Sequence, residues 1–222
     1  MSYHSSNYSS TQSLENNGFY SKVMSWLALS FGVAAVGVFL IGPLVPPAFI
    51  LPLSIIVIVA LIAASFSRKM MKLSGPFAVI IPLLLGVTLY PTLNYYISSG
   101  MGNVVGMAAG GTAVVFGTMA VLGWVSKISL NSWAPKLFMI VMGLIAVSLL
   151  NVFFFKLAFL SLIISMVVVV VFAIYTFIDI QAIRDRSPNS EVPASFYALN
   201  IFLDIYNIFA SLLNIIGFFN RA

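Results

Sequence analysis

Seven long apolar segments, separated by short polar stretches, make up nearly all of the chain after residue 18. Each segment is close to the ~20 residues that an α-helix needs to cross the hydrocarbon core of a bilayer. The pattern predicts an all-α membrane protein with seven transmembrane helices. The predicted spans are residues 23–41, 49–66, 75–93, 104–125, 133–154, 157–183 and 193–219.

The first 18 residues differ from the rest of the chain. They are rich in Ser, Asn and Tyr and show no apolar periodicity. A signal peptide is not expected here, because a basic start followed by an apolar core is missing. We therefore predict a flexible tail over residues 1–18 and one seven-helix transmembrane domain over residues 19–222.

The composition supports the membrane interpretation and excludes several kinds of site. The chain is 61% hydrophobic and 7% charged, whereas soluble domains are about 25% charged. It has no cysteine, and its only histidine, His4, lies in the predicted tail. These absences exclude disulfides, thiolate metal sites and histidine catalysis inside the membrane, and no resident cofactor is expected.

The cations predict the topology. Eight of the ten Lys and Arg residues fall on one side of the predicted spans. The bias places the N-terminus in the cytoplasm and, with seven spans, the C-terminus outside. The net charge of +5 is thus explained by the membrane, and no nucleic-acid partner is implied. The eight are Lys22, Arg68, Lys69, Lys72, Lys127, Lys136, Arg184 and Arg186, and the other two are Lys156 and Arg221.

Two aspartates lie inside the last two apolar segments. Asp179 is in the sixth and Asp204 is in the seventh, with the polar loop SPNSEVP between the two segments. In an antiparallel hairpin both carboxyls would lie roughly 15 Å from the turn. A buried ionisable residue in a membrane is costly, and this cost makes the pair a candidate functional site.

Asp204 belongs to a polar stripe on the last span. The spacing of four, three, four and three residues puts the members on one helix face. Such a face cannot contact lipid, so it must face the bundle interior or water. Hydrogen bonding between helices would explain the amides and the serine, but a carboxyl is a poorer means of joining helices, which favours a functional pair. The stripe comprises Asn200, Asp204, Asn207, Ser211 and Asn214.

Two carboxyls in contact share one proton and titrate in coupled steps. When the shared proton leaves, the charges repel each other or recruit a cation. Calcium accepts irregular sets of oxygen ligands, so Asp179 and Asp204, helped by Asn200 and Asn207, form a candidate calcium site. Arg68 at the end of the second span is the best cationic partner for the pair, although it is also explained as a topology charge.

The fourth span begins with small residues at four-residue spacing, Gly102, Gly106 and Gly110, followed by Gly111. Such spacing lets helix backbones approach closely. We interpret the run as helix packing in preference to a pore lining.

The residues around the aspartates resemble those of the Bax inhibitor-1 family. FIDIQAI in the sixth span and LDIYNIFASLLNIIGFF in the seventh carry the resemblance. The stretch NYYISSGMGNVVGMAAGGTAVVFG is similar to the third-to-fourth span region of bacterial members. The resemblance covers nearly all of the chain after the tail and implies a bacterial inner-membrane protein.

The resemblance implies a seven-helix fold in which the other helices wrap around a central last helix. It implies a pH-sensitive calcium leak gated by a proton-sharing pair, Asp179 and Asp204, which Arg68 contacts. Some members carry a glutamate midway along the second helix. This chain reads SIIVIVALI around Val57 and therefore lacks that acid. Some bacterial relatives resemble modulators of a membrane-bound ATP-dependent protease, an activity without a residue signature.

Three functions are therefore compared. The first is a pH-sensitive calcium leak whose partners are the bilayer, calcium ions and protons. The second is a regulator of a membrane-bound protease or stress response, without transport activity. The third, an intramembrane aspartyl protease, is disfavoured because Ile201, Phe202 and Leu203 stand where such enzymes have flexible glycines, and no Pro-Ala-Leu motif occurs. We therefore expect no enzyme activity.

Overall fold

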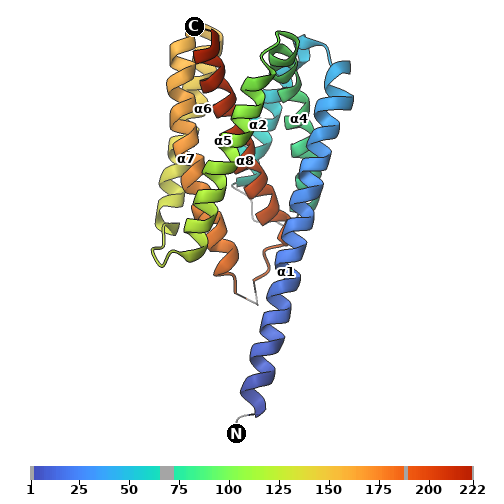
Figure 1. Cartoon of the computed structure of the whole chain (residues 1–222), viewed down its shortest axis with the longest axis vertical. Coiled ribbons are helices and arrows are strands. Elements are labelled where there is room, and N and C mark those ends of the chain that lie inside the picture. The colour runs from blue at the N-terminus through green and yellow to red at the C-terminus, as the bar shows by residue number, and fades with distance from the viewer. Residues whose placement is uncertain (1–2, 66–72, 188–189, 222) are drawn as a thin grey trace. The chain divides into compact units, whose positions relative to one another are not determined.

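The computed structural model describes residues 3–65, 73–187 and 190–221, and these residues contain helices and no strand. The helices are α1 (Tyr3–Val36), α2 (Ile50–Ser65), α4 (Ser74–Ser98), α5 (Gly102–Val125), α6 (Ala134–Leu150), α7 (Ala158–Arg184) and α8 (Ala194–Arg221) (Figure 1). Two π-helical turns, η1 (Gly37–Ile41) and η5 (Asn151–Phe155), extend α1 and α6. Short 3₁₀ turns are η2 (Gly42–Leu44), η3 (Pro47–Phe49) and η4 (Asn131–Trp133).

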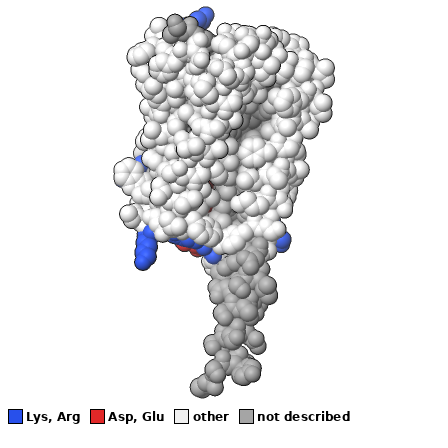
Figure 2. All heavy atoms as spheres, in the orientation of Figure 1, with Lys and Arg blue, Asp and Glu red and all other residues white. Residues whose placement is uncertain are grey.

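Six of the helical segments are long and apolar enough to cross a membrane. The prediction of an all-α membrane protein is therefore confirmed. The predicted second span corresponds to a shorter apolar helix, Pro47–Ala63 among the described residues, so the count of seven spans stays a prediction. On the face drawn in Figure 2, charged side chains are few and most of the described surface is uncharged, as lipid contact requires.

The predicted N-terminal tail is helical where the structure describes it. α1 begins at Tyr3 and continues without a break through the first candidate span. The polar composition of residues 3–17 does not prevent this helix, because no proline lies among them. That the tail is flexible in solution stays a prediction.

The described chain divides into two compact units. The first takes its residues from Met1–Pro91 and Arg186–Phe202, and the second from Thr92–Asp185 and Leu203–Ala222. Both aspartates belong to the second unit. α8 contributes to both units, and it has the largest buried share of the six candidate spans.

The first unit holds α1 against α4 through closely approaching backbones. A methyl group on Gly37 would collide with the carbonyl oxygen of Leu83, and one on Gly86 would collide with that of Ala34. The Ser30 hydroxyl donates a hydrogen bond of 2.8 Å to the carbonyl of Ala78 nearby. Glycine is therefore required on both sides of this helix crossing.

In the second unit α7 packs against both α5 and α6 (Figure 1). Leu137 of α6 and Val171, Phe177 and Ile178 of α7 form a buried apolar cluster. On the α5 side the backbones approach so closely that a Cβ on Gly123 would lie 2.6 Å from the carbonyl oxygen of Phe177. This packing fixes the part of α7 that carries Asp179.

The glycine run at the start of α5 does not make the predicted packing contact. A Cβ on Gly102, Gly106 or Gly110 would meet no described atom within 4 Å, and all three residues are exposed. The packing interpretation is wrong for these positions, because four-residue spacing keeps them on the face of α5 that is turned away from its neighbours. Gly111 is the exception, since its Cβ would lie 3.1 Å from Leu212 of α8.

Candidate functional site

The two predicted aspartates are brought together in the second unit. Asp179 lies five residues before the end of α7, and Asp204 is in the part of α8 that belongs to the same unit. The carboxyls are close enough to interact electrostatically. Asp204 is 3% exposed and Asp179 is partly buried. The site therefore places two acids of neighbouring helices in one poorly solvated region.

One carboxylate oxygen has no partner. Among the described residues, no group hydrogen-bonds the buried Oδ2 of Asp204. A buried acceptor without a partner is destabilising, and more so when it carries charge. A proton on this carboxyl or a cation beside it would remove that cost.

Thr176 is the nearest polar neighbour of Asp204 on α7. Its hydroxyl donates a 2.9 Å hydrogen bond to the carbonyl of Phe172 and also lies within hydrogen-bond reach of the Asp204 carboxyl. A hydroxyl has only one hydrogen to donate. While Thr176 donates to Phe172, it can only accept from Asp204, and this requires a protonated carboxyl. Ionised Asp204 would require Thr176 to turn its hydrogen away from Phe172.

Tyr175 connects the site to α6. Its hydroxyl is close enough to interact electrostatically with both Asp179 and Asp204. The hydroxyl donates a 3.3 Å hydrogen bond to the carbonyl of Ala134 in the first turn of α6. Tyr175 and Thr176 are not among the residues that the sequence predicts for the site, although both occur in the stretch YTFID, which interrupts an otherwise apolar segment with polar side chains.

The polar stripe of α8 has several roles. Asp204 and Ser211 are buried, whereas Asn200 and Asn207 are partly buried and Asn214 is exposed. Asn207 donates to the carbonyl of Leu203 in its own helix. Asn214 donates to Ser165 Oγ at 2.8 Å and to the carbonyl of Ser161 at 3.3 Å. At Asn214 the stripe therefore joins α8 to α7, which is the hydrogen bonding between helices that the sequence offers as the alternative role of the amides.

The predicted cationic partner, Arg68, lies outside the described residues, and its role stays a prediction. Within the described residues, no group of three or more His, Cys, Asp or Glu side chains could hold a metal ion. A calcium ion at Asp179 and Asp204 would therefore need carbonyl, amide or hydroxyl oxygens as further ligands. Its presence also stays a prediction.

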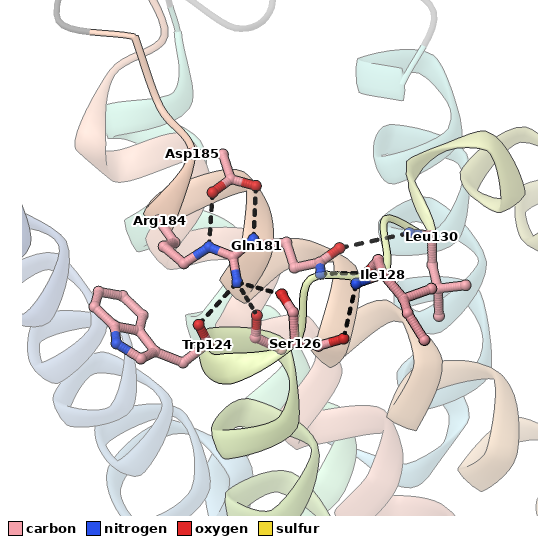
Figure 3. Close-up of polar contacts among 8 residues, drawn as sticks. Trp124, Ser126, Ile128, Leu130, Gln181, Arg184 and Asp185 are labelled. Carbon is pink, nitrogen blue, oxygen red and sulfur yellow. Dashed lines mark hydrogen bonds and ion pairs between the residues drawn. The ribbon is translucent and has the colours of Figure 1, made fainter.

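A second polar cluster, which we call the α7 clamp, closes the end of α7 (Figure 3). It consists of Gln181, Arg184 and Asp185. Nη1 of Arg184 donates to the carbonyls of Gly123, Trp124 and Ser126 at 3.0, 2.8 and 2.7 Å. The guanidinium thus caps the C-terminus of α5, where the carbonyls have no helical partner.

Gln181 and Asp185 are the other two members of the clamp. Gln181 is buried and donates a 2.7 Å hydrogen bond to the carbonyl of Ile128, while its Oε1 accepts from the amide of Leu130 at 3.5 Å. Arg184 also makes a bidentate pair with Asp185, at 2.7 and 2.9 Å. The hydrogen bond from Arg184 lowers the pKa of Asp185 below its ordinary value. The sequence predicts only a topology charge at Arg184, because its partners are distant in the sequence.

The comparisons with known proteins agree with this architecture. Residues 16–221 match the family described as "Inhibitor of apoptosis-promoting Bax1". The chain belongs to the Bax inhibitor-1 family. The resemblance that we derived from the sequences around Asp179 and Asp204 is therefore confirmed at the level of the family.

Bacterial relatives match most of the chain. An uncharacterized protein of Helicobacter pylori strain J99 is 31% identical over 163 residues, which cover 73% of this chain and 69% of the relative. The Escherichia coli K12 protein named "Modulator of FtsH protease YccA" is 31% identical over 137 residues, 62% of this chain and 61% of that protein. A Campylobacter jejuni protein is 33% identical over 136 residues, covering 61% and 57%. The last two matches span less than two thirds of each relative.

Proposed function

We propose that this member of the Bax inhibitor-1 family is a membrane-embedded regulator of an ATP-dependent membrane protease. The observation that carries the proposal is the similarity to the E. coli modulator of FtsH protease. The aspartate pair supplies the switch in this proposal, because its protonation state decides how α7 and α8 pack. We further propose an inner-membrane location with a cytoplasmic N-terminus.

The switch is proposed to work through one proton. With that proton on Asp204, this carboxyl is neutral, and its single hydrogen can be donated either to Asp179 or to Thr176. When it leaves, the charges repel by several kcal/mol at contact distance, even with a moderate effective dielectric. A helix packing with two states a few kcal/mol apart can be switched by this amount. The unpartnered Oδ2 of Asp204 supports the protonated form as the resting state.

Proteolysis by a reconstituted protease tests this proposal. The purified chain is placed in proteoliposomes with FtsH, ATP and a membrane substrate, and degradation is followed between pH 6 and 8. We expect the chain to change the degradation rate, and Asp179→Asn and Asp204→Asn to remove the pH dependence of that change. The double variant should add little, because the two acids act as a unit.

Asp185→Asn is the matched control, since it removes an acid from α7's end without touching the pair. It should keep the pH dependence of the unmodified chain. A degradation rate that is identical with and without the chain at every pH would contradict the regulator proposal. Unchanged pH profiles in both single variants would contradict the switch alone.

A pH-sensitive calcium leak is the second candidate function. The buried oxygen of Asp204 without a partner favours it, because a cation could occupy that position. Calcium flux into liposomes that contain only this protein distinguishes the two functions. Flux that disappears in Asp179→Asn and Asp204→Asn would support the leak, and flux equal to that of empty liposomes would exclude it.

We propose no enzymatic activity for the aspartate pair. The backbone before Asp204 is continuous α-helix through Ile201, Phe202 and Leu203, and the first two of these residues are buried. A substrate strand needs exposed backbone groups near the catalytic acid. The helix uses those groups for its own hydrogen bonds.

A further inference from the structure

A surface rich in cations and aromatic or apolar side chains lies between α5 and α6. We call it the basic turn and define it as Lys127, Ile128, Trp133 and Lys136. All four residues are exposed, Ile128 to 70% and Trp133 to 50%. The ammonium group of Lys136 lies 5.0 Å from the centre of the Trp133 ring, a favourable cation–π distance.

The basic turn lies where a membrane surface is expected. One candidate span ends at Val125 and the next begins at Asn131, so only residues 126–130 separate them. A turn this short cannot leave the headgroup layer. Tryptophan and lysine are the residues that anchor helix ends at this depth. The turn between α4 and α5, residues 99–101, is shorter still but carries no charge.

The α7 clamp gives the basic turn a fixed shape and leaves the positive charge of its two lysines uncancelled. Arg184 covers the carbonyls at the end of α5, which would otherwise present the negative end of the helix dipole. Its own charge is balanced by Asp185. Residues 126–136 contain Lys127 and Lys136 and no acid. Gln181 holds the backbone of Ile128 and Leu130, so the lysines project from a supported turn.

We propose that the basic turn binds the headgroups of anionic phospholipids in the leaflet on its side of the membrane. The two lysines provide the charge, while Ile128 and Trp133 enter the boundary between headgroups and acyl chains. This combination recognises a negatively charged headgroup above an apolar layer. The proposal is independent of any action on a protease.

Lipid selectivity at Trp133 tests the proposal. The other two tryptophans, Trp26 and Trp124, are replaced by phenylalanine in the full chain, which leaves Trp133 as the only indole. The protein is placed in nanodiscs with brominated phosphatidylglycerol or brominated phosphatidylcholine, and quenching of Trp133 is compared. We expect stronger quenching by the anionic lipid, and a preference that weakens as salt is raised from 50 to 500 mM, since salt screens exposed charges.

Lys127→Gln with Lys136→Gln removes the proposed charge. We expect the preference for the anionic lipid to fall about fivefold for each lysine removed. Lys156→Gln with Arg221→Gln is the control, because it removes the same charge from the predicted opposite side and should leave the preference unchanged. Thermal unfolding of each variant confirms that it is folded.

Two results would overturn the proposal. One is equal quenching by the two lipids in the protein that retains both lysines, a measurement that does not depend on the folding of the lysine variants. The other is an unchanged lipid preference in the folded lysine double variant, which would show that these two charges do not select the lipid.

Discussion

Two turns of the second unit are closed by polar side chains, but in different ways. The turn from α6 to α7 is closed by a residue that lies within it. Asn151 donates to the carbonyl of Leu157 and to Ser161 Oγ, and it accepts from the amide of Leu157. Lys156 in this turn adopts a left-handed conformation with φ 53°, and its amide donates to the carbonyl of Asn151.

The turn from α5 to α6 is closed from a distance. Its carbonyls and one amide are held by Gln181 and Arg184, whose partners lie 51 to 61 residues earlier in the chain. Both side chains come from the last turns of α7, just after Asp179. The first turn can therefore form without the rest of the unit, whereas the second requires α7 in its packed position. Only the second depends on the part of α7 that carries Asp179.

The largest expected loss of stability comes from the local turn. Asn151→Leu removes three hydrogen bonds of a buried side chain. Unsatisfied partners and lost bonds together should cost about 2–4 kcal/mol. Thermal unfolding in detergent measures this loss. The pH profile of the folded protein should stay unchanged, and a shifted profile would show that this turn also communicates with the aspartates.

Breaking the turn that is closed from a distance should reduce stability less, but it should also change the pH profile. Gln181→Leu removes one strong and one long hydrogen bond at the basic turn. We expect a loss of about 1–2 kcal/mol, together with a shift in the pH dependence of regulation or flux. Gln181→Glu, which keeps the acceptor but loses the donor, separates the two bonds. An unchanged pH profile in Gln181→Leu would remove the difference between the two turns.

Two substitutions of Thr176 on α7 test whether its hydroxyl matters for the pH profile. Thr176→Val removes the hydroxyl that pairs with Asp204 and Phe172, and should cost about 1 kcal/mol. Thr176→Ser keeps the hydroxyl and should keep the pH profile of the unmodified protein. Regulation or calcium flux from pH 6 to 8 measures both. If valine and serine give the same profile, Thr176 does not report the proton on Asp204.

The smallest effect is expected at Asp185. The pKa of this exposed carboxyl is lowered by the hydrogen bond from Arg184. A lowered pKa in the folded protein gives stability that is complete above the ordinary value of about 3.9 and is lost only as the pH falls through the lowered value. Asp185→Asn should therefore change stability very little and add no pH dependence between pH 5 and 8. A pH-dependent difference in that range, measured by thermal unfolding, would contradict this assignment.

The sequence predicted the parts of this protein that depend on local pattern. Apolar length located the helices, and the spacing from Asp204 to Asn214 located the polar face of α8. The pairing of Asp179 with Asp204 was predictable because two costly residues on consecutive helices have few ways to avoid lipid. The role predicted for Arg68 stays a prediction, because this residue lies outside the described residues.

The α7 clamp was not predictable in the same way. Arg184 and Lys127 look alike in a sequence, since each is a cation at the end of an apolar segment. Only the packing of α5 against α7 gives Arg184 three carbonyls to cap. The glycines show that sequence spacing alone does not locate close packing, because Gly123 lies outside the regular run, yet a Cβ on it would lie 2.6 Å from the carbonyl oxygen of Phe177 in α7.

The contact between Gly123 and Phe177 restricts how this unit can move. Arg184 holds the same end of α5, so that helix and the last two turns of α7 are fastened at two points. Sliding one past the other would break both fastenings at once. α5 and α7 should thus move as one stiff element. Under the proposed switch, the displacement that follows proton loss from the aspartates would fall to α8, whose side chains, including Leu212 and Asn214, meet that element.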